Sequence, residues 1–264
     1  MSVRWPLQAW RATRVVLHFC AGLATTMGVF PFVDMANRRK LTQRWSARLL
    51  HLLHIEHRVL GEHDATQGNL LVVANHVSWL DIFALNAHRP LRFVAKAELA
   101  RWPLAGRLAR GAGTIFISRE RRHDTRRVNR DAAHALASGD VVGVFPEGTT
   151  TDGSTLLRFH ASLLQPIIES QGQVAAVAIV YRDTRGARSL ATVYGDETLM
   201  TSFWRVCGEP ALVVELTYTG ALDARGVHRR ELARAAEAAI RTALGLSPDA
   251  MAPGTHAGRR VEPQ

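Results

Sequence analysis

Residues 70–81 read Leu-Leu-Val-Val-Ala-Asn-His-Val-Ser-Trp-Leu-Asp, and this stretch decides the fold. Its first five residues are apolar and rich in valine and leucine, which predicts a buried strand that delivers His76 to its carboxyl end. Ligands of open α/β sheets bind at that end. Ser78 is a good N-cap, and a helix begun near it brings Asp81 to the His76 turn. A histidine with a nearby carboxylate is the simplest general-base pair, which makes His76 and Asp81 candidate catalytic residues. The alternative is that Asp81 only favours the helix dipole.

A second polar block, Phe-Pro-Glu-Gly-Thr-Thr at residues 145–150, follows the apolar run Val141 to Val144. Both polar blocks therefore stand at the ends of comparable predicted strands. Strands are expected at 70–74, 91–95, 114–118, 141–145, 174–181 and 212–217, and helices near 79–87, 98–110, 125–137 and 160–170. Residues 228–244 predict a further packing helix with one apolar face. The succession of strand, helix and strand predicts an α/β domain with a mostly parallel central sheet flanked by helices.

The N-terminal part is apolar and basic. The run from Val15 to Val33 carries no formal charge and is long enough to span a bilayer. Polar residues dilute this run, however, and arginines flank it on both sides. Residues 38–60 mix arginines with leucines and tryptophan, as expected of a helix lying in the membrane interface. Two helices turned near Pro31 form a membrane-associated hairpin in this interpretation; alternatively, both helices cover the core. No convincing signal-peptide cleavage site follows. We expect an N-terminal hairpin at 1–60, one catalytic domain at 61–246 and a disordered tail at 247–264.

Composition limits the classes of partner. Lys and Arg outnumber Asp and Glu by 33 to 23, which gives a net charge of +10 and a pI near 10.9. The surface should therefore attract anionic lipid or nucleic acid. No helix-turn-helix or zinc module is recognisable, so we expect no nucleic-acid partner, although a non-enzymatic basic membrane-binding protein remains a rival interpretation. Cys20 and Cys207 form no metal-ligand pair or disulfide framework, and Cys207 is expected in a loop. His51, His54 and His57 lack further ordered ligands, and we expect no metal.

These blocks together resemble the glycerolipid acyltransferase family, which includes the 1-acylglycerol-3-phosphate acyltransferases and whose first block is His-x4-Asp. Residues 145–149 look like the third block, and 177–180 are a weak fourth that lacks the proline often found there. The resemblance covers roughly residues 65 to 185. The second block is matched by Lys96, Leu99, Pro103, Gly106, Gly113, Phe116, Ile117 and Arg119.

The resemblance implies acyl transfer from coenzyme A or acyl carrier protein to the free hydroxyl of a lysolipid, at the cytoplasmic face of the inner membrane. The acyl thioester is a co-substrate, and no other cofactor is expected. His76 would take the hydroxyl proton and Asp81 would orient His76, without a covalent enzyme intermediate. The sequence does not identify the donors to the oxyanion, and backbone amides near Gly148 or Gly113 are candidates. Residues expected to bind or shape the substrates are Asn75, Lys96, Arg119, Glu147, Gly148 and Thr149.

The first expected acceptor is 1-acyl-sn-glycerol 3-phosphate, which would give phosphatidic acid. Lysophosphatidate-specific relatives often carry arginine after the third block, whereas Thr150 stands here. Because an arginine fork suits phosphate oxygens, its replacement by a hydroxyl makes another lysolipid, such as a lyso-ornithine lipid, the alternative acceptor. A hydrolase that activates water with the same pair is a second rival; it would release free fatty acid without an acceptor.

Overall fold

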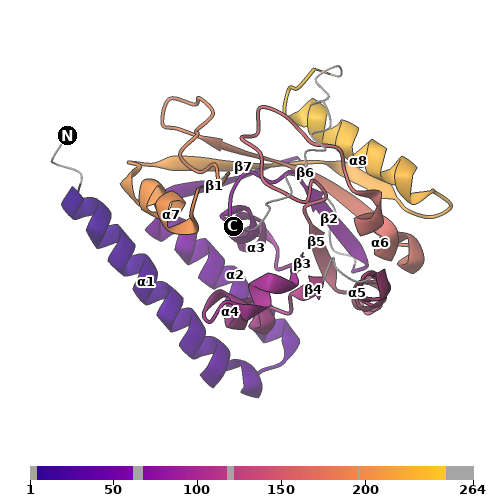
Figure 1. The fold of residues 1–264 in the computed structure, drawn as a ribbon, viewed down its shortest axis with the longest axis horizontal. Coiled ribbons are helices and arrows are strands. Elements are labelled where there is room, and N and C mark those ends of the chain that lie inside the picture. The colour runs from indigo at the N-terminus through magenta and orange to yellow at the C-terminus, as the bar shows by residue number, and fades with distance from the viewer. Residues whose placement is uncertain (1–4, 62–67, 118–121, 196, 248–264) are drawn as a thin grey trace, which may run out of the picture.

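The computed structural model describes residues 5–61, 68–117, 122–195 and 197–247 (Figure 1). Arg119 and, apart from Ser247, the expected tail lie outside these ranges. Within the described residues the chain builds a seven-stranded sheet in the order β1-β7-β6-β2-β5-β3-β4. Its strands are β1 (Ile55–Leu60), β2 (Leu70–Ala74), β3 (Arg92–Lys96), β4 (Ile115–Ile117), β5 (Val141–Val144), β6 (Gln173–Arg182) and β7 (Leu212–Asp223).

The sheet is mostly parallel, as the sequence predicts. Strands β2 to β6 run in one direction, whereas β1 and β7 are parallel to each other and antiparallel to the remainder through the β6–β7 pair. All six expected strands are present, and β2 has its expected bounds. The carboxyl ends of β2, β3, β5 and β6 therefore meet at one edge of the sheet, which is where the two polar blocks of the sequence lie.

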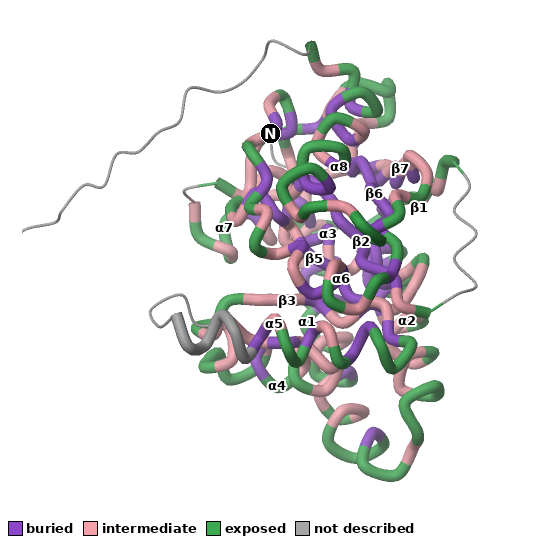
Figure 2. The backbone as a smooth tube through the Cα atoms, turned by 90° about the vertical axis from the view of Figure 1, so that its right-hand side faces the viewer, coloured by how far each residue is buried: buried purple, intermediate pink, exposed green. Residues whose placement is uncertain are grey.

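Helices cover both faces of the sheet (Figure 1). One apolar core lies between the sheet and α1, α2, α3 and α7, and the other lies between the sheet and α5, α6 and α8. Because side chains alternate along a strand, Leu70 and Val72 enter the first core while Leu71 and Val73 enter the second. Figure 2 shows the central strands as the buried part of the fold. The helices are α1 (Trp5–Gly28), α2 (Met35–Leu52), α3 (Asp81–His88), α4 (Ala105–Gly111), α5 (Arg122–Ala137), α6 (Gln165–Ser170), α7 (Leu199–Gly208) and α8 (Arg229–Ala243), with short 3-10 turns η1 (Phe30–Phe32), η2 (Ala97–Arg101) and η3 (Ala161–Leu164).

The N-terminal helices form the expected hairpin, which turns at Pro31 in η1. α2 starts at an N-cap, Asp34, whose side chain accepts the backbone N–H of Asn37 at 2.8 Å. The two helices differ in what they contact: α2 buries Leu49 and Leu50 against the sheet, so the interpretation that it covers the core is correct for its second half.

α1 instead exposes a long apolar face. Trp10, Leu17 and Met27 are 60%, 63% and 63% exposed, and Phe32 at the tip is 85% exposed. The segment Trp5–Phe32 is long and apolar enough to cross a membrane by length and composition, and 17% of its most apolar window is buried. An exposed apolar face of this size marks a surface that another apolar phase or molecule covers.

The expected interface helix over 38–60 is wrong in its last part. α2 ends at Leu52, His54 adopts a left-handed backbone conformation (φ 58°), and Ile55–Leu60 is the edge strand β1, paired in parallel with β7. The sequence contained a sign of this strand, because Glu56 and Arg58 are polar at every second position after the apolar Ile55. In the structure Ile55 is buried while Glu56 and Arg58 are exposed, which is the period of a strand. α7 was also not expected, and Cys207 is buried in it instead of lying in a loop.

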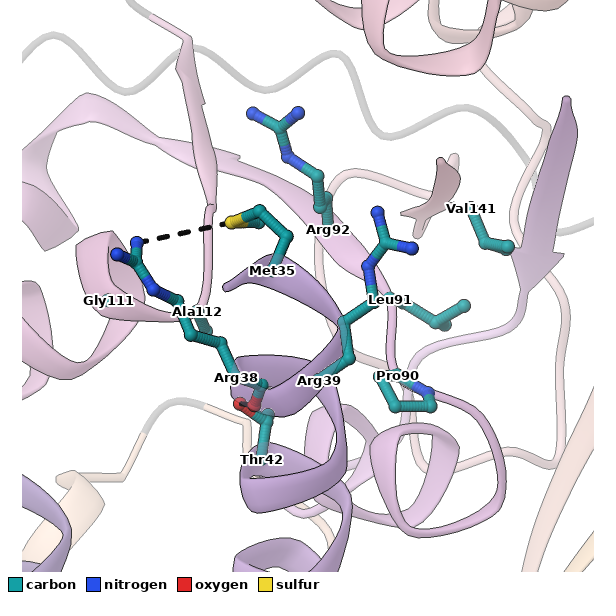
Figure 3. Close-up of a pocket in the computed structure, with 10 residues that line it drawn as sticks. All are labelled: Met35, Arg38, Arg39, Thr42, Pro90, Leu91, Arg92, Gly111, Ala112 and Val141. Atoms are coloured by element: carbon teal, nitrogen blue, oxygen red, sulfur yellow. Dashed lines mark hydrogen bonds between the residues drawn. The ribbon is translucent and has the colours of Figure 1, made fainter. Parts of the chain in front are cut away.

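A small hollow marks where α2 is attached to the sheet edge (Figure 3). The guanidinium groups of Arg38, Arg39 and Arg92 surround the side chain of Met35 there. Asp140, just before β5, accepts from Arg92 Nη1 at 2.7 Å and also from Arg39. These residues lie at the amino ends of β3 and β5, which is the edge opposite His76, so the hollow is a structural junction and not the reaction site.

Candidate active site

The turn between β2 and α3 holds the histidine–aspartate pair. Asp81 Oδ2 accepts from Nδ1 of His76 at 2.7 Å, as the sequence predicts, and also from the backbone N–H groups of Val77 at 2.8 Å and Ser78 at 2.9 Å. Asp81 is the first residue of α3 and is fully buried. One carboxylate oxygen therefore binds both the backbone of the turn and the imidazole ring. This shared acceptor fixes the ring relative to the turn. The expected cap is shifted: the Ser78 hydroxyl accepts from the Leu80 N–H at 3.3 Å, and α3 begins later.

The arrangement assigns the imidazole tautomer. A carboxylate oxygen that accepts two backbone N–H bonds acts as an acceptor toward the ring too, so Nδ1 of His76 carries the proton. Nε2 is then the basic nitrogen. The His76 side chain is 20% exposed at the carboxyl edge of the sheet, whereas that of Asp81 is 0% exposed. The buried partner thus orients a ring whose basic side reaches the surface.

Aromatic stacking holds the plane of the ring. Phe145, at the end of β5, stacks on His76 with centroids 4.1 Å apart and planes 13° apart, and Phe93 of β3 stacks on Phe145 at 5.7 Å. Gly143 makes this possible, because a Cβ at that position would lie 2.8 Å from the Phe93 ring. The stack crosses three neighbouring strands, β2, β5 and β3, and leaves the His76 ring little freedom to rotate.

Glu147 supports the same turn from β5. Its Oε1 accepts the backbone N–H of His76 at 2.8 Å, and its Oε2 accepts that of Leu157 at 3.0 Å. The residue is 3% exposed, and this burial raises the pKa of Glu147 to about 7, opposed by the two backbone hydrogen bonds. Both carboxylate oxygens are thus used by the protein itself, so Glu147 positions the His76 backbone and does not present a free carboxylate to a ligand.

Three further expected positions are also occupied by internal contacts. Asn75 is 1% exposed and bridges to β6, where it donates to the Ile179 carbonyl at 3.1 Å and accepts from the Ile179 N–H at 2.7 Å. The N–H of Gly148 donates to Phe145 O at 3.1 Å, and that of Gly113 to Arg110 O at 3.0 Å. The amides of these two glycines therefore already have acceptors, which leaves the neighbouring amides as candidate oxyanion donors.

Two expected substrate residues lie exposed at the carboxyl edge. Thr149 follows β5, and within the described residues its backbone N–H and its hydroxyl donate to no protein acceptor. Lys96 is the last residue of β3, two strands from β2. Both are available to a ligand. The described residues contain no group of three or more His, Cys, Asp or Glu side chains able to hold a metal ion.

Two loops line the site: one continues from the polar block at residues 145–150, and the other, around Tyr194, was not indicated by the sequence. The N–H of Thr151 donates to His76 O at 2.8 Å, and that of Tyr194 donates to Val77 O at 3.1 Å. The Thr150 hydroxyl donates to the Tyr194 carbonyl and joins the two loops. The second loop is in turn fixed by Arg205 of α7, which donates to the carbonyls of Ala191 at 2.8 Å and Val193 at 2.5 Å and pairs with Glu197.

The cysteines do not take part in this arrangement. Cys207 is buried in α7, and burial raises the pKa of its thiol to about 11, which makes it a poor nucleophile. Cys20 is exposed on the apolar face of α1.

A mostly parallel α/β sheet that presents an aspartate-held imidazole at its carboxyl edge is an arrangement that suits general-base chemistry. The model of the family described as Acyltransferase matches residues 56–181, from β1 to the end of β6. A lyso-ornithine lipid O-acyltransferase of Pseudomonas aeruginosa is 42% identical over 207 residues, which cover 78% of this chain and 79% of that protein. A 1-acyl-sn-glycerol-3-phosphate acyltransferase of Neisseria gonorrhoeae is 41% identical over 155 residues, covering 59% and 61%.

The chain belongs to the acyltransferase family and is an O-acyltransferase. The fold has a known counterpart in the crystal structure of the 1-acyl-sn-glycerophosphate acyltransferase PlsC from Thermotoga maritima, with a TM-score of 0.65 at 21% identity, covering 90% of this chain and 96% of that one. The predicted fold class and the predicted family are therefore confirmed.

Proposed function

We propose that the enzyme transfers an acyl group from a thioester, acyl-coenzyme A or acyl carrier protein, to the free hydroxyl of a lysolipid. The observation that carries this proposal is the 2.7 Å contact between Asp81 Oδ2 and His76 Nδ1, which leaves Nε2 as a base at the exposed edge of the sheet. A base in that position can take the proton of an acceptor hydroxyl.

The reaction follows from this geometry. Nε2 of His76 accepts the hydroxyl proton as the acceptor oxygen attacks the thioester carbonyl, and the imidazolium that forms is stabilised by Asp81. When the tetrahedral intermediate collapses, the carbon–sulfur bond breaks and the thiolate leaves with the proton from Nε2. The free N–H and hydroxyl of Thr149 are candidate donors to the oxyanion, because both are exposed at the same edge.

The acceptor is an anionic or zwitterionic lysolipid in this proposal. Lysophosphatidate is the first candidate, and Lys96 together with Arg119, which lies outside the described residues, would hold its phosphate. A lyso-ornithine lipid is the second candidate, and two observations favour it: Thr150 is tied to the Tyr194 carbonyl where related enzymes often have arginine, and the Pseudomonas relative that matches 207 residues acts on that lipid.

The enzyme works at a membrane surface in this proposal, at the cytoplasmic face of the inner membrane. Support comes from the apolar outer face of α1 and from apolar side chains on two elements packed against it. Met200 and Trp204 of α7 are 70% and 37% exposed, and Trp102 beside α4 is 46% exposed. The net charge of +10 favours anionic lipid.

The test is a thiol-release assay on the purified full-length chain in detergent or vesicles. Each donor is offered with lysophosphatidate, with lyso-ornithine lipid or with no acceptor, and lipid products are read by mass spectrometry. We expect thiol release that depends on a lysolipid and yields the diacyl product. Release of free fatty acid without an acceptor would show that the same base activates water, and it would disprove the proposal.

A further inference from the structure

Tyr181 extends the histidine–aspartate pair. It lies near the end of β6, one hundred positions from Asp81, and its hydroxyl donates to Asp81 Oδ1 at 2.9 Å. Its side chain is 1% exposed, and Asp81 is fully buried. β6 and β5 lie on opposite sides of β2 in the sheet. The catalytic turn is therefore held from both neighbouring strands, by Tyr181 on one side and by Glu147 on the other.

The two oxygens of Asp81 are held in different ways. Oδ2 accepts from Nδ1 of His76 and from two backbone N–H groups, whereas the only partner of Oδ1 among the described residues is the Tyr181 hydroxyl. Burial, followed by the charge of Asp81, raises the pKa of Tyr181 well above its ordinary value. The phenol therefore stays protonated and acts as a donor to the carboxylate at any pH at which the enzyme works.

We propose that Tyr181 is a positioning residue of the acyl transfer reaction, whose hydroxyl holds the Asp81 carboxylate in the rotation that aims Oδ2 at His76. The terminal torsion of an aspartate is broad, so backbone bonds to one oxygen do not by themselves set the carboxylate plane. A second donor, on Oδ1, does set the plane of the carboxylate. This inference rests on the proposed function.

The titratable groups that face Asp81 are few. Among the described residues, the titratable side chains that hydrogen-bond to Asp81 are His76 and Tyr181, and no lysine or arginine forms an ion pair with it. Glu147 interacts electrostatically with both His76 and Asp81 at longer range. Loss of the Tyr181 hydroxyl should therefore act mainly on the His76–Asp81 bond. The influence of Glu147 on this pair should be the same in wild type and in a variant without the hydroxyl.

The experiment compares Tyr181→Phe with a matched control, Tyr218→Phe. Tyr218 is also a buried tyrosine, 7% exposed, in the neighbouring strand β7, but its ring lies beside His88 and not at Asp81. Each variant loses a single buried hydroxyl. The measurements are kcat and KM for the lysolipid, the pH dependence of kcat, the thermal midpoint, and the NMR resonance of the His76 Nδ1 proton.

We expect Tyr181→Phe to lower kcat by about tenfold or more, as for loss of a hydrogen bond to a charged group, with little change in KM. The acidic limb of its kcat profile should move to lower pH, because a carboxylate that is no longer aimed at His76 stabilises the imidazolium less. The Nδ1 proton resonance should shift. A purely structural role would lower the thermal midpoint in both variants and leave the acidic limb and the resonance in place.

The inference is overturned if Tyr181→Phe and Tyr218→Phe share the same kcat, acidic limb and Nδ1 resonance, or if the limb moves to higher pH. Failure of the proposed function is recognised separately, because wild type would then release no thiol in response to a lysolipid. In that case the Nδ1 resonance still decides whether Tyr181 sets the His76–Asp81 bond.

Discussion

Glu147 Oε1 accepts the backbone N–H of His76 at 2.8 Å, although the two residues are 71 positions apart in the chain. β2 and β5 are neighbours in the sheet, so the residues that follow them meet at one edge. The contact makes the polar block at residues 145–150 a support for the one at residues 75–81. It also buries an ionisable group beside the reaction site, with consequences for stability and pH.

The first prediction concerns that buried carboxyl group. The pKa of Glu147 is raised from 4.5 to about 7 in the folded chain, so the folded state binds a proton that the unfolded state has released. Its stabilising contribution is therefore complete below the unfolded pKa and is lost as pH rises toward 7. The shift corresponds to at most about 3 kcal/mol. The free energy of unfolding of wild type should fall over this window, and that of Glu147→Gln should fall less.

Urea unfolding at a series of pH values measures this effect. Glu169→Gln, at an exposed position of α6, is the matched control and should keep the wild-type slope. Glu147→Gln should also be less stable than wild type at low pH, by about 1–3 kcal/mol, because its amide nitrogen would face a backbone N–H. Parallel pH curves for wild type and Glu147→Gln would show that the pKa of this carboxyl group does not change on folding.

The second prediction separates the two members of the dyad. His76→Ala should lower turnover by roughly 10²–10⁴-fold, the usual worth of a positioned general base. Asp81→Asn should lower turnover as well and should also lower the thermal midpoint, since an amide group would meet four hydrogen-bond donors in a buried site. Initial rates and thermal unfolding of both variants are the measurements. Near-normal turnover in His76→Ala contradicts the mechanism.

The third prediction concerns the acceptor. Thr150→Arg should shift the ratio of specificity constants toward lysophosphatidate and away from lyso-ornithine lipid, because a guanidinium fork binds a phosphate with charge-assisted bonds. Thr150→Val is the matched control: it removes the hydrogen bond to the Tyr194 carbonyl without adding a charge. A competition assay with both acceptors and one donor gives the ratio. If Arg and Val at this position change the ratio equally, position 150 acts through the loop and does not face the head group.

The fourth prediction concerns the membrane surface. Deletion of residues 1–60 is a poor test, because it removes Leu49 and Leu50 from the core and β1 from the sheet. The double variant Trp10→Glu and Leu17→Glu instead changes only the exposed face of α1. Burying a large apolar side chain is worth about 1.5–3 kcal/mol, so each change should weaken vesicle binding by about tenfold or more.

Vesicle sedimentation and activity on soluble short-chain acceptors form the readout for these α1 variants. Binding should fall while activity on short-chain acceptors stays close to wild type. Leu60→Glu, at a residue of β1 that is 47% exposed, is the control and should leave binding unchanged. Full sedimentation of the double variant would show that α1 does not contact the bilayer. Binding of wild type should also weaken with salt, since the basic residues near an anionic surface are screened.

The sequence by itself determined the features that depend on neighbours along the chain. The apolar run Leu70–Ala74 and the five-residue step from His76 to Asp81 are local, and a strand followed by a helix brings the two side chains together whatever surrounds them. The alternation of strands and helices in the same way predicted a mostly parallel sheet, and the turn at Pro31 predicted the N-terminal hairpin.

Only the tertiary structure decided what holds that pair in place. The strand order puts β6 and β5 on either side of β2, and this brings Tyr181 and Glu147 to the turn from distances of one hundred and 71 positions. The tertiary structure also gives Asn75 and the Gly148 amide hydrogen-bond partners within the protein. It places Ile55–Leu60 at the edge of the sheet as a strand. Periodicity along the chain shows which face of an element is apolar, but not which strand will be its neighbour, because pairing depends on the packing of all the layers together.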